Sequence, residues 1–379
     1  MTTKQRICII CLFLAGLALV GCQPGPSLDA TPGPATTRVP AATATSVPTA
    51  TATPIPVPGE ILIMMNRALV SLPADPSGGN SEAKIIISQK EFDRSIPIPG
   101  EIDTPVTSLF LSPDGTKFAL YTCKIVGYSC FEHRVFISTI DLSSQVTILN
   151  YEGGLLAWSP TSEHILLQGN KNPQDKFVVG GGDDFAYLLQ LPPADAAFWS
   201  YDGKQIYFYR DGWHVINSDG TNEQEVTCDL CALAPTPSSF AVAQSPDGEY
   251  VAIGYRDGTV FIVRQDNFAD FKIGSAGSYI SRLFWSPDGS RLAVNVDTST
   301  SQSDIVILDK EGVTVEKMTR PEGVNLTILC GWSPDSQYID YLTIRENGYD
   351  LFLHKIGETD SIQRLSIETS DQNCPVWLD

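Results

Sequence analysis

Short apolar runs alternate with polar turns along most of the chain. From Gly59 onward, segments of four to eight apolar-rich residues recur between Gly, Pro, Asp and Asn. The clearest group predicts strands at residues 280–285, 291–296, 304–308 and 313–319. No segment sustains the 3.6-residue periodicity of an amphipathic helix. We therefore predict an all-β domain over residues 59–379.

A twelve-residue pattern repeats in this domain at intervals of 41 to 47 residues. Each copy has an apolar run, a turn of the Ser-Pro-Asp-Gly type and a second apolar run. The copies are LFLSPDGTKFAL (109–120), LAWSPTSEHILL (156–167), AFWSYDGKQIYF (197–208), VAQSPDGEYVAI (242–253), LFWSPDGSRLAV (283–294) and CGWSPDSQYIDY (330–341). Such a period is in the range of propeller blades with four strands each.

The residues of the repeated turn suit a tight reversal between two strands. Pro presets φ, Asp or Ser can bond the turn amides, and Gly accepts the left-handed position. Three copies depart from the pattern: Thr161-Ser162 replace Asp-Gly, Tyr201 replaces Pro, and Ser336 replaces Gly. We interpret these departures as decayed turns rather than as altered chemistry.

Five of the six tryptophans occupy one column of the repeat, directly before the serine or its equivalent. They are Trp158, Trp199, Trp285, Trp332 and Trp377. An aromatic column can stack on a ligand, but one that recurs in nearly every repeat is more typical of a core. We expect these side chains to pack between blades.

The two ends of the domain complement each other. Six copies are complete, and CPVWLD (374–379) matches only the first half of another. The missing strands are expected at residues 60–65, 68–72 and 84–88. One blade built from both termini would close the ring and remove exposed strand edges. We predict a seven-bladed β-propeller, with six or eight blades as alternatives.

This repeat resembles the TolB-type, or WD-like, β-propeller family over essentially all of residues 59–379. Similar propellers act as protein-interaction platforms, as gating domains of prolyl-oligopeptidase-type hydrolases, and occasionally as lyases. The resemblance implies the fold and leaves the function open.

The N-terminal segment has the layout of an export signal. Lys4 and Arg6 precede an uncharged apolar run over residues 7–20, which is shorter than the ~20 residues of a spanning helix. The following LVGC (19–22) resembles the bacterial lipobox, which implies cleavage before Cys22 and lipid on that residue. The alternative is a differently processed signal with a chance cysteine. We predict a lipoprotein signal peptide at 1–21 and an extracytoplasmic, membrane-anchored protein.

Residues 22–58 are predicted to be a lipidated cysteine followed by a disordered linker. Pro, Thr and Ala make up nearly all of residues 24–58, so the segment lacks the apolar side chains that a core requires. Frequent proline favours an extended, semi-rigid spacer. Lipid on Cys22 is then the expected membrane attachment.

The formal net charge of the 379-residue chain is −19. An acidic surface repels nucleic-acid phosphates, which makes nucleic acid an unfavourable partner. We expect a monomer that binds an envelope protein or an extracellular polymer.

Nine cysteines are present, of which Cys8 and Cys11 lie in the expected signal. Six others lie in the exported domain and permit 15 disulfide pairings. The local pairs Cys123–Cys130 and Cys228–Cys231 are the economical choice and leave Cys330–Cys374 to join the sixth blade to the closing strand. A redox or zinc role for Cys228-x-x-Cys231 is the alternative.

Long connections on one face of the propeller are the candidate binding segments. They are residues 89–105, 123–133, 169–184 and 228–239. Their candidate residues are Tyr128, Phe131 and His133, together with Asp175, Asp183 and Asp184, which could hold Ca²⁺. Tolerated surface insertions are the alternative. The run at 180–182 is interpreted as a flexible glycine loop rather than a phosphate loop.

Catalysis finds little support in the sequence, and no catalytic residue is assigned. The four histidines are scattered, and no Gly-x-Ser-x-Gly motif is present. We expect a non-catalytic binding platform that needs no cofactor. The alternative is a carbohydrate-active or other lyase or hydrolase propeller with its site at the central opening.

Overall fold

The structure is a computed structural model, and all 28 elements that it describes are β-strands. It describes residues 59–65, 68–74, 83–90, 106–126, 129–140, 147–149, 153–169, 177–181, 186–192, 194, 196–226, 241–265, 271–299, 302–318, 320, 324, 326–345, 348–367 and 374–378. Within these ranges, no helix combines the length and hydropathy needed to span a membrane. The predicted signal, Cys22 and the linker lie outside the described residues.

Six antiparallel sheets are each formed by four strands that follow one another in sequence. The first two are β4 (Val106–Leu111), β5 (Lys117–Val126), β6 (Ser129–Thr139), β7 (Thr147–Leu149), and β8 (Gly153–Trp158), β9 (His164–Gly169), β10 (Phe177–Gly181), β11 (Ala186–Gln190). The next two are β12 (Ala196–Trp199), β13 (Gln205–Tyr209), β14 (Trp213–Asn217), β15 (Gln224–Glu225), and β16 (Ala241–Gln244), β17 (Tyr250–Gly254), β18 (Thr259–Arg264), β19 (Phe271–Ser275). The last two are β20 (Tyr279–Trp285), β21 (Arg291–Ser299), β22 (Gln302–Asp309), β23 (Thr314–Lys317), and β24 (Thr327–Trp332), β25 (Tyr338–Arg345), β26 (Gly348–Lys355), β27 (Ser361–Ile367).

A further four-stranded sheet joins the two ends of the described chain in the order β28-β1-β2-β3. Its strands are β1 (Glu60–Met65), β2 (Ala68–Pro73), β3 (Lys84–Ile87) and β28 (Val376–Leu378). β28 pairs antiparallel with β1 at three positions, from Glu60↔Leu378 to Leu62↔Val376. The pairing of strands from both ends agrees with the expected mode of closure.

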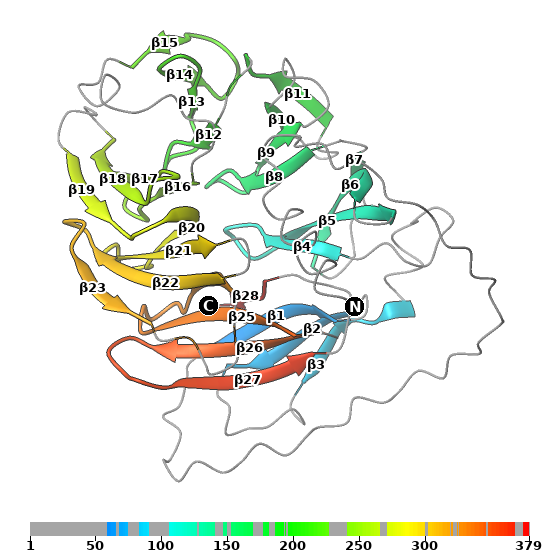
Figure 1. Ribbon diagram of the computed structural model, residues 1–379. Helices are drawn as coiled ribbons and strands as arrows, with labels where there is room; N and C mark the ends of the chain where they lie inside the picture. Colours follow the sequence, from blue (N-terminus) through cyan, green and yellow to red (C-terminus); the bar gives the residue numbers. More distant parts are fainter. Residues whose placement is uncertain are drawn as a thin grey trace, which may run out of the picture.

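First strands of several neighbouring sheets lie against one another, among them β4 with β8, β16 with β20 and β20 with β24, and the sheets are arranged radially around a centre (Figure 1). The blade count needs a correction. The sequence predicts a seven-bladed propeller, whereas the structure has six complete blades of consecutive strands, a number kept as an alternative, and one composite four-stranded sheet where the ring closes. The composite sheet is not counted as a seventh complete blade, because its first strand is too short. This strand, β28, has three residues and is shorter than the first strand of any complete blade.

The repeated turns join the first strand of each blade to the second, as predicted. In the first of them, Gly115 has a φ of +68° and its amide donates to Ser112 O at 2.8 Å. The Ser112 hydroxyl donates to Asp114 Oδ1 at 2.6 Å, and the amide of Thr116 donates to the same oxygen at 3.0 Å. These bonds to the ionised carboxylate, against an opposing effect of burial, lower the pKa of Asp114 to about 2.

Two variant turns show that their interpretation as decayed turns is wrong. Ser162 and Ser336 occupy the left-handed glycine position, with φ values of 61° and 59°. Each serine hydroxyl accepts a hydrogen bond from the turn of the preceding blade: Asp114 N donates to Ser162 Oγ at 3.0 Å, and Asp288 N donates to Ser336 Oγ at 3.0 Å. The serines therefore connect neighbouring blades, which a glycine could not do.

The tryptophan column packs between blades, as predicted. Trp158, Trp199, Trp285 and Trp332 are 4 to 9% exposed. Three of them donate their indole N–H to a backbone carbonyl of the preceding blade: Trp158 to Phe110 O at 3.3 Å, Trp285 to Ala243 O at 3.1 Å, and Trp332 to Phe284 O at 2.9 Å. The column therefore sets the contact between successive blades.

Two segments expected to be long loops contain strands. β5 and β6 extend as a hairpin as far as Val126↔Ser129, because the alternating residues of 123–133 can continue the ladder. In the next blade, Gly180 and Gly181 belong to β10, where they pair with Ile165 and His164. The first part of the glycine run is therefore a strand rather than a flexible loop.

Candidate functional site

The connections between second and third strands lie on one face of the propeller, which we call the loop face. Two of them, on neighbouring blades, have the same sequence: Tyr209-Arg210-Asp211-Gly212 joins β13 to β14, and Tyr255-Arg256-Asp257-Gly258 joins β17 to β18. A Cβ on Gly258, whose φ is +87°, would lie 2.6 Å from the backbone carbon of Gly277. Glycine is therefore required there, and the tight turn exposes the arginine at its tip.

A shared aromatic layer supports both turns. Tyr209 and Tyr255 are 7% and 6% exposed and belong to one hydrophobic cluster. Tyr209 meets Trp213 edge-on, with ring centroids 5.4 Å apart, and Tyr255 meets Phe261 in the same way at 5.3 Å. Burial, followed by the nearby Tyr209 and Asp257, raises the pKa of Tyr255 to about 12, so its hydroxyl stays protonated.

Each arginine lies against an aromatic ring. Arg256 is exposed, and its Cζ lies 5.6 Å from the centroid of Tyr279. Arg210 lies 5.7 Å from the centroid of Phe208 and forms a 2.7 Å ion pair with Glu223 Oε1. Stacking on an aromatic face limits the arginine's freedom and keeps its donors directed outward.

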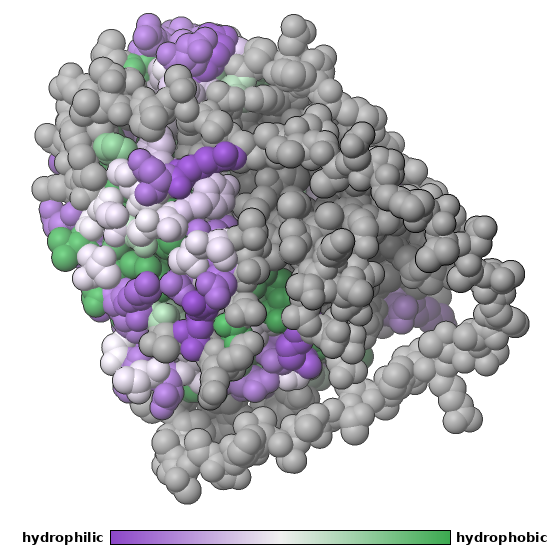
Figure 2. Space-filling view, in the orientation of Figure 1, coloured by the Kyte–Doolittle hydropathy of each residue, from purple (hydrophilic) through white to green (hydrophobic). Residues whose placement is uncertain are grey.

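These residues form what we call the arginine–aromatic surface: Tyr209, Arg210, Tyr255, Arg256 and Tyr279. Tyrosine and arginine are enriched in the energetically dominant centres of protein interfaces. At the outer edge of the same region, Figure 2 shows hydrophilic residues gathered near the top of the view, where Figure 1 places β15. The arrangement can bind a partner through stacking and charge-assisted hydrogen bonds.

A polar junction fixes the loop-face side of the next two blades. Asn295 Oδ1 accepts a hydrogen bond from Leu329 N at 2.7 Å, which links β21 to β24. The Ser303 hydroxyl and Thr327 exchange further bonds, including one of 2.7 Å from Thr327 N to Ser303 Oγ. All three polar side chains are buried, so these bonds hold the blades in register.

Arg282 and Asp297 lie beside this junction. Burial raises the pKa of Asp297 to about 6, against opposing effects of the Ser281 hydroxyl and Arg282. Burial also lowers the pKa of Arg282 to about 10, while Asp297 opposes that change. The arginine remains a cation at neutral pH, and the carboxyl group titrates near the physiological range.

The closing disulfide joins Cys330 of β24 to Cys374, two residues before β28, with Cα atoms 5.2 Å apart. This is the pair that remained after the two local pairs were assigned. Cys123 lies on β5 and Cys130 on β6, but their side chains are outside what the structure describes. Cys228 and Cys231 also lie outside the described residues, so both local pairs stay predictions.

The predicted binding residues fall largely outside the described parts of the chain. Phe131 and His133 lie on β6, near the loop-face end of the extended hairpin, but their side chains are not described. Tyr128, Asp175, Asp183 and Asp184 lie outside the described ranges. Because β10 ends at Gly181, residues 183 and 184 follow the third strand and are not part of the second-to-third connection.

The described histidines lie in three separate surroundings. His164 packs beside Trp199, and His214 stacks on Phe208 and lies 3.5 Å from Glu223. His354 is buried and meets Glu316 Oε1 at 2.7 Å. Among the described residues, no group of three or more His, Cys, Asp or Glu side chains could hold a metal ion. Calcium at the predicted aspartates stays a prediction.

The arginine–aromatic surface was not assigned from the sequence. In the sequence, the Tyr-Arg-Asp-Gly repeat indicates only a hairpin turn, because Asp-Gly is a common turn pair. The sequence signal that could have revealed this surface is the Tyr-Arg pair before Asp-Gly, because the pair recurs at corresponding positions of neighbouring blades.

Comparisons with known proteins agree with a propeller. Residues 236–263 match the family described as WD domain, G-beta repeat. The ciliary WD repeat-containing protein ctxp80 of Euplotoides octocarinatus is 24% identical over 212 residues. The match covers 53% of this chain and 29% of that protein, so this chain spans under a third of the relative's length.

A solved structure shows the same architecture. The β-propeller domain of Cps50 (Swd1) from Myceliophteria thermophila superposes with a TM-score of 0.52 at 13% identity, over 72% of this chain and 89% of that one. The finer resemblance to TolB-type propellers stays a prediction. The protein therefore has a β-propeller fold, and its residues 236–263 are similar to a WD repeat.

Proposed function

We propose that this protein is a lipid-anchored β-propeller that binds a protein partner at the cell envelope and performs no chemistry of its own. The arginine–aromatic surface carries the proposal. Two arginines on matched turns of neighbouring blades rest on buried or half-buried rings, which is the composition of an interface centre. The similarity to WD repeats supports the same role.

The partner is expected to present carboxylates beside apolar groups. Arg210 and Arg256 offer planar donors that suit carboxylates, and the half-buried Tyr279 offers apolar contact area with a polar edge. The chain as a whole has a formal net charge of −19, so contact with an acidic partner would depend on these two arginines rather than on the overall field of the protein. The propeller is proposed to act as a monomer.

The anchor is proposed to be lipid on Cys22, displayed on the extracytoplasmic side of a membrane. The LVGC (19–22) motif supports this, and the Pro-rich linker would place the propeller up to ~100 Å from the bilayer. Replacing Cys22 with Ser should move the protein from the membrane fraction to the soluble fraction. The matched variant Cys11→Ser should leave it in the membrane fraction.

The binding role is tested by chemical crosslinking of the lipidated protein in its own cells, followed by mass spectrometry. One dominant protein should be captured, and the Arg210→Ala/Arg256→Ala double variant should lower its yield by roughly tenfold or more. Lys204→Ala is the matched control, because Lys204 is an exposed cation on the opposite face. Equal capture by all variants would contradict the assigned surface, and capture of glycans instead would favour the enzymatic alternative.

A further inference from the structure

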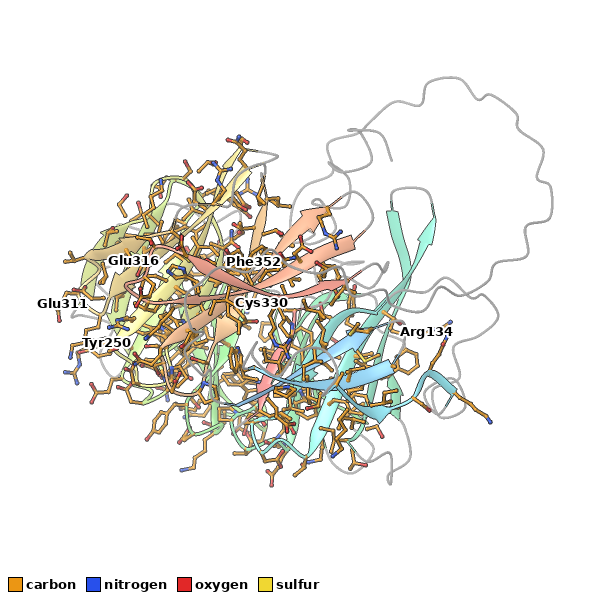
Figure 3. All side chains as sticks on the ribbon, turned by 90° about the horizontal axis from the view of Figure 1, so that it is seen from below. Arg134, Tyr250, Glu311, Glu316, Cys330 and Phe352 are labelled. Atoms are coloured by element: carbon orange, nitrogen blue, oxygen red, sulfur yellow. A yellow bond between two sulfur atoms is a disulfide. The ribbon has the colours of Figure 1, made fainter. Side chains whose placement is uncertain are left out.

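Three elements of the ring meet at the closing disulfide. Cys330 lies at a bulge in β24, Cys374 lies just before β28, and Arg282 reaches Cys374 from β20 of the neighbouring blade. Arg282 Nη1 is 3.2 Å from Cys374 Sγ and donates to Leu329 O at 3.1 Å. Figure 3 shows Cys330 in the middle of the molecule, among the inner strands. A fixed cation therefore contacts one sulfur of the disulfide.

This contact favours the reduced form. A guanidinium beside a sulfur stabilises the thiolate, and stabilising the reduced state makes a disulfide easier to reduce. The surroundings also suit two free thiols. Cys330 Sγ lies 3.6 Å from Ile328 O and Cys374 Sγ lies 3.9 Å from Leu329 O, so each thiol would have a backbone acceptor nearby.

The two sulfurs differ in access. Cys330 is 8% exposed, whereas Cys374 is half-buried and lies on the short terminal segment. An incoming thiolate would therefore reach Cys374 first. The cation is thus placed beside the sulfur of the more exposed cysteine.

We propose that the Cys330–Cys374 bond is a thiol–disulfide exchange site that controls closure of the ring, with a dithiol as its reaction partner. A thiolate of the dithiol attacks Cys374 Sγ, the disulfide bond breaks, and the electron pair leaves on Cys330, which takes up a proton. The second thiolate of the dithiol then attacks its own partner sulfur in the mixed disulfide and releases the Cys374 thiolate. The dithiol loses two electrons and becomes a disulfide, and the propeller gains two thiols.

Arg282 acts in the second step, because its guanidinium lies where the negative charge of the departing Cys374 sulfur develops. It is a positioning residue for the exchange and does not itself change covalently. Reoxidation by a partner disulfide reverses the two steps.

Opening this bond loosens the ring at β28, a strand of three residues. β28 would then be held by three paired positions on β1, by side-chain packing, and by the 2.9 Å hydrogen bond from Trp377 Nε1 to Asp340 Oδ1. The disulfide cross-link between β24 of the sixth blade and the segment before β28 would be gone. Exchange at one site therefore changes how often the ring opens.

The test equilibrates the full-length protein with dithiothreitol redox buffers and quantifies Cys330 and Cys374 by peptide-specific differential alkylation and mass spectrometry. Arg282→Met should shift the equilibrium constant towards the disulfide by about tenfold and slow release of the mixed disulfide, while Arg282→Lys should lie nearer the wild type. Arg364→Met is the matched control, because Arg364 donates to Pro73 O at the same junction without touching sulfur. An unchanged equilibrium in Arg282→Met, or an equal shift in Arg364→Met, would overturn the proposal.

A second measurement needs no arginine variant. Amide hydrogen exchange of residues 376–378 should be at least about tenfold faster in the reduced wild type than in the oxidised protein, while β17 should be unchanged. The Cys330→Ser/Cys374→Ser double variant should show the fast exchange under both conditions. Slow exchange in the reduced wild type would overturn the claim that the bond controls closure.

Discussion

Trp377 donates its indole N–H to Asp340 Oδ1 across 2.9 Å, and this bond differs from those of three other tryptophans in the column. Trp158, Trp285 and Trp332 each donate to a backbone carbonyl of the preceding blade. At the ring closure, a carboxylate side chain from the second strand of the sixth blade takes that place. The contact that closes the ring is therefore titratable, unlike its counterparts.

This difference predicts that stability falls as the pH rises. Asp340 is fully buried, and burial raises its pKa to about 7, against opposing bonds that include the one from Trp377. Between about pH 4 and pH 7, the folded protein holds a proton that the unfolded chain releases, so the free energy of unfolding decreases with pH in this window. The expected loss is roughly 3–5 kcal/mol, complete above about pH 7. Urea unfolding at pH 5, 6, 7 and 8 measures it.

Asp340→Asn isolates this effect, because asparagine keeps an acceptor for Trp377 and carries no charge. The variant should be more stable than the wild type at pH 8, and the difference should shrink towards pH 5. Asp297→Asn is the comparison variant. The pKa of Asp297 is raised to about 6, so its removal should change stability in the same direction but over a narrower pH window. A pH-independent difference between Asp340→Asn and wild type would show that the carboxyl group does not titrate in this range.

The tryptophan column predicts unequal costs for one substitution. Trp332 donates to Phe284 O at 2.9 Å, whereas Trp199 Nε1 is buried and has no hydrogen-bond partner among the described residues. Trp332→Phe and Trp199→Phe remove the same atoms, but only the first leaves a carbonyl unsatisfied. Trp332→Phe should therefore cost about 1 kcal/mol more than Trp199→Phe in the free energy of unfolding. The denaturant midpoints of the two variants measure this difference. Equal losses of stability would contradict a stabilising hydrogen bond from Trp332 to Phe284 O.

The variant turns predict that serine stabilises through its hydroxyl. Ser336→Ala keeps the left-handed backbone and removes the acceptor of the Asp288 amide, so it should destabilise by about 1–2 kcal/mol. Ser336→Gly loses the same bond but relieves the backbone strain, so it should cost about 1 kcal/mol less. Thermal unfolding of the pair measures the strain directly. A glycine variant that is less stable than the alanine variant would contradict this account.

The sequence predicted much of the fold because the repeat combines turn chemistry with strand patterning. The strands around 280–319 lie close to their expected positions, and β1 has the expected bounds. The pairing of β28 with β1 followed from the truncated last repeat. These features are local, or follow from closure of a ring, so periodicity alone reveals them.

Contacts between blades could not be predicted in the same way. Nothing local indicates that Ser162 and Ser336 would accept bonds from neighbouring turns, or that Asp340 would face Trp377. The extension of β5 and β6 was missed because its residues were weighed as binding groups rather than as a continuing ladder. The cation beside Cys374 depends on a side chain 92 positions earlier in the chain, which only the folded ring brings close.

The most direct test of the interaction platform is photo-crosslinking in living cells from two positions of one blade. Ser275 is exposed at the loop-face end of β19, and Glu249 is exposed on the opposite face of the same blade. A photoreactive residue at 275 should crosslink to one protein, the Arg256→Ala change should abolish that adduct, and a photoreactive residue at 249 should give none. The same adducts from both positions, or none from 275, would contradict the account.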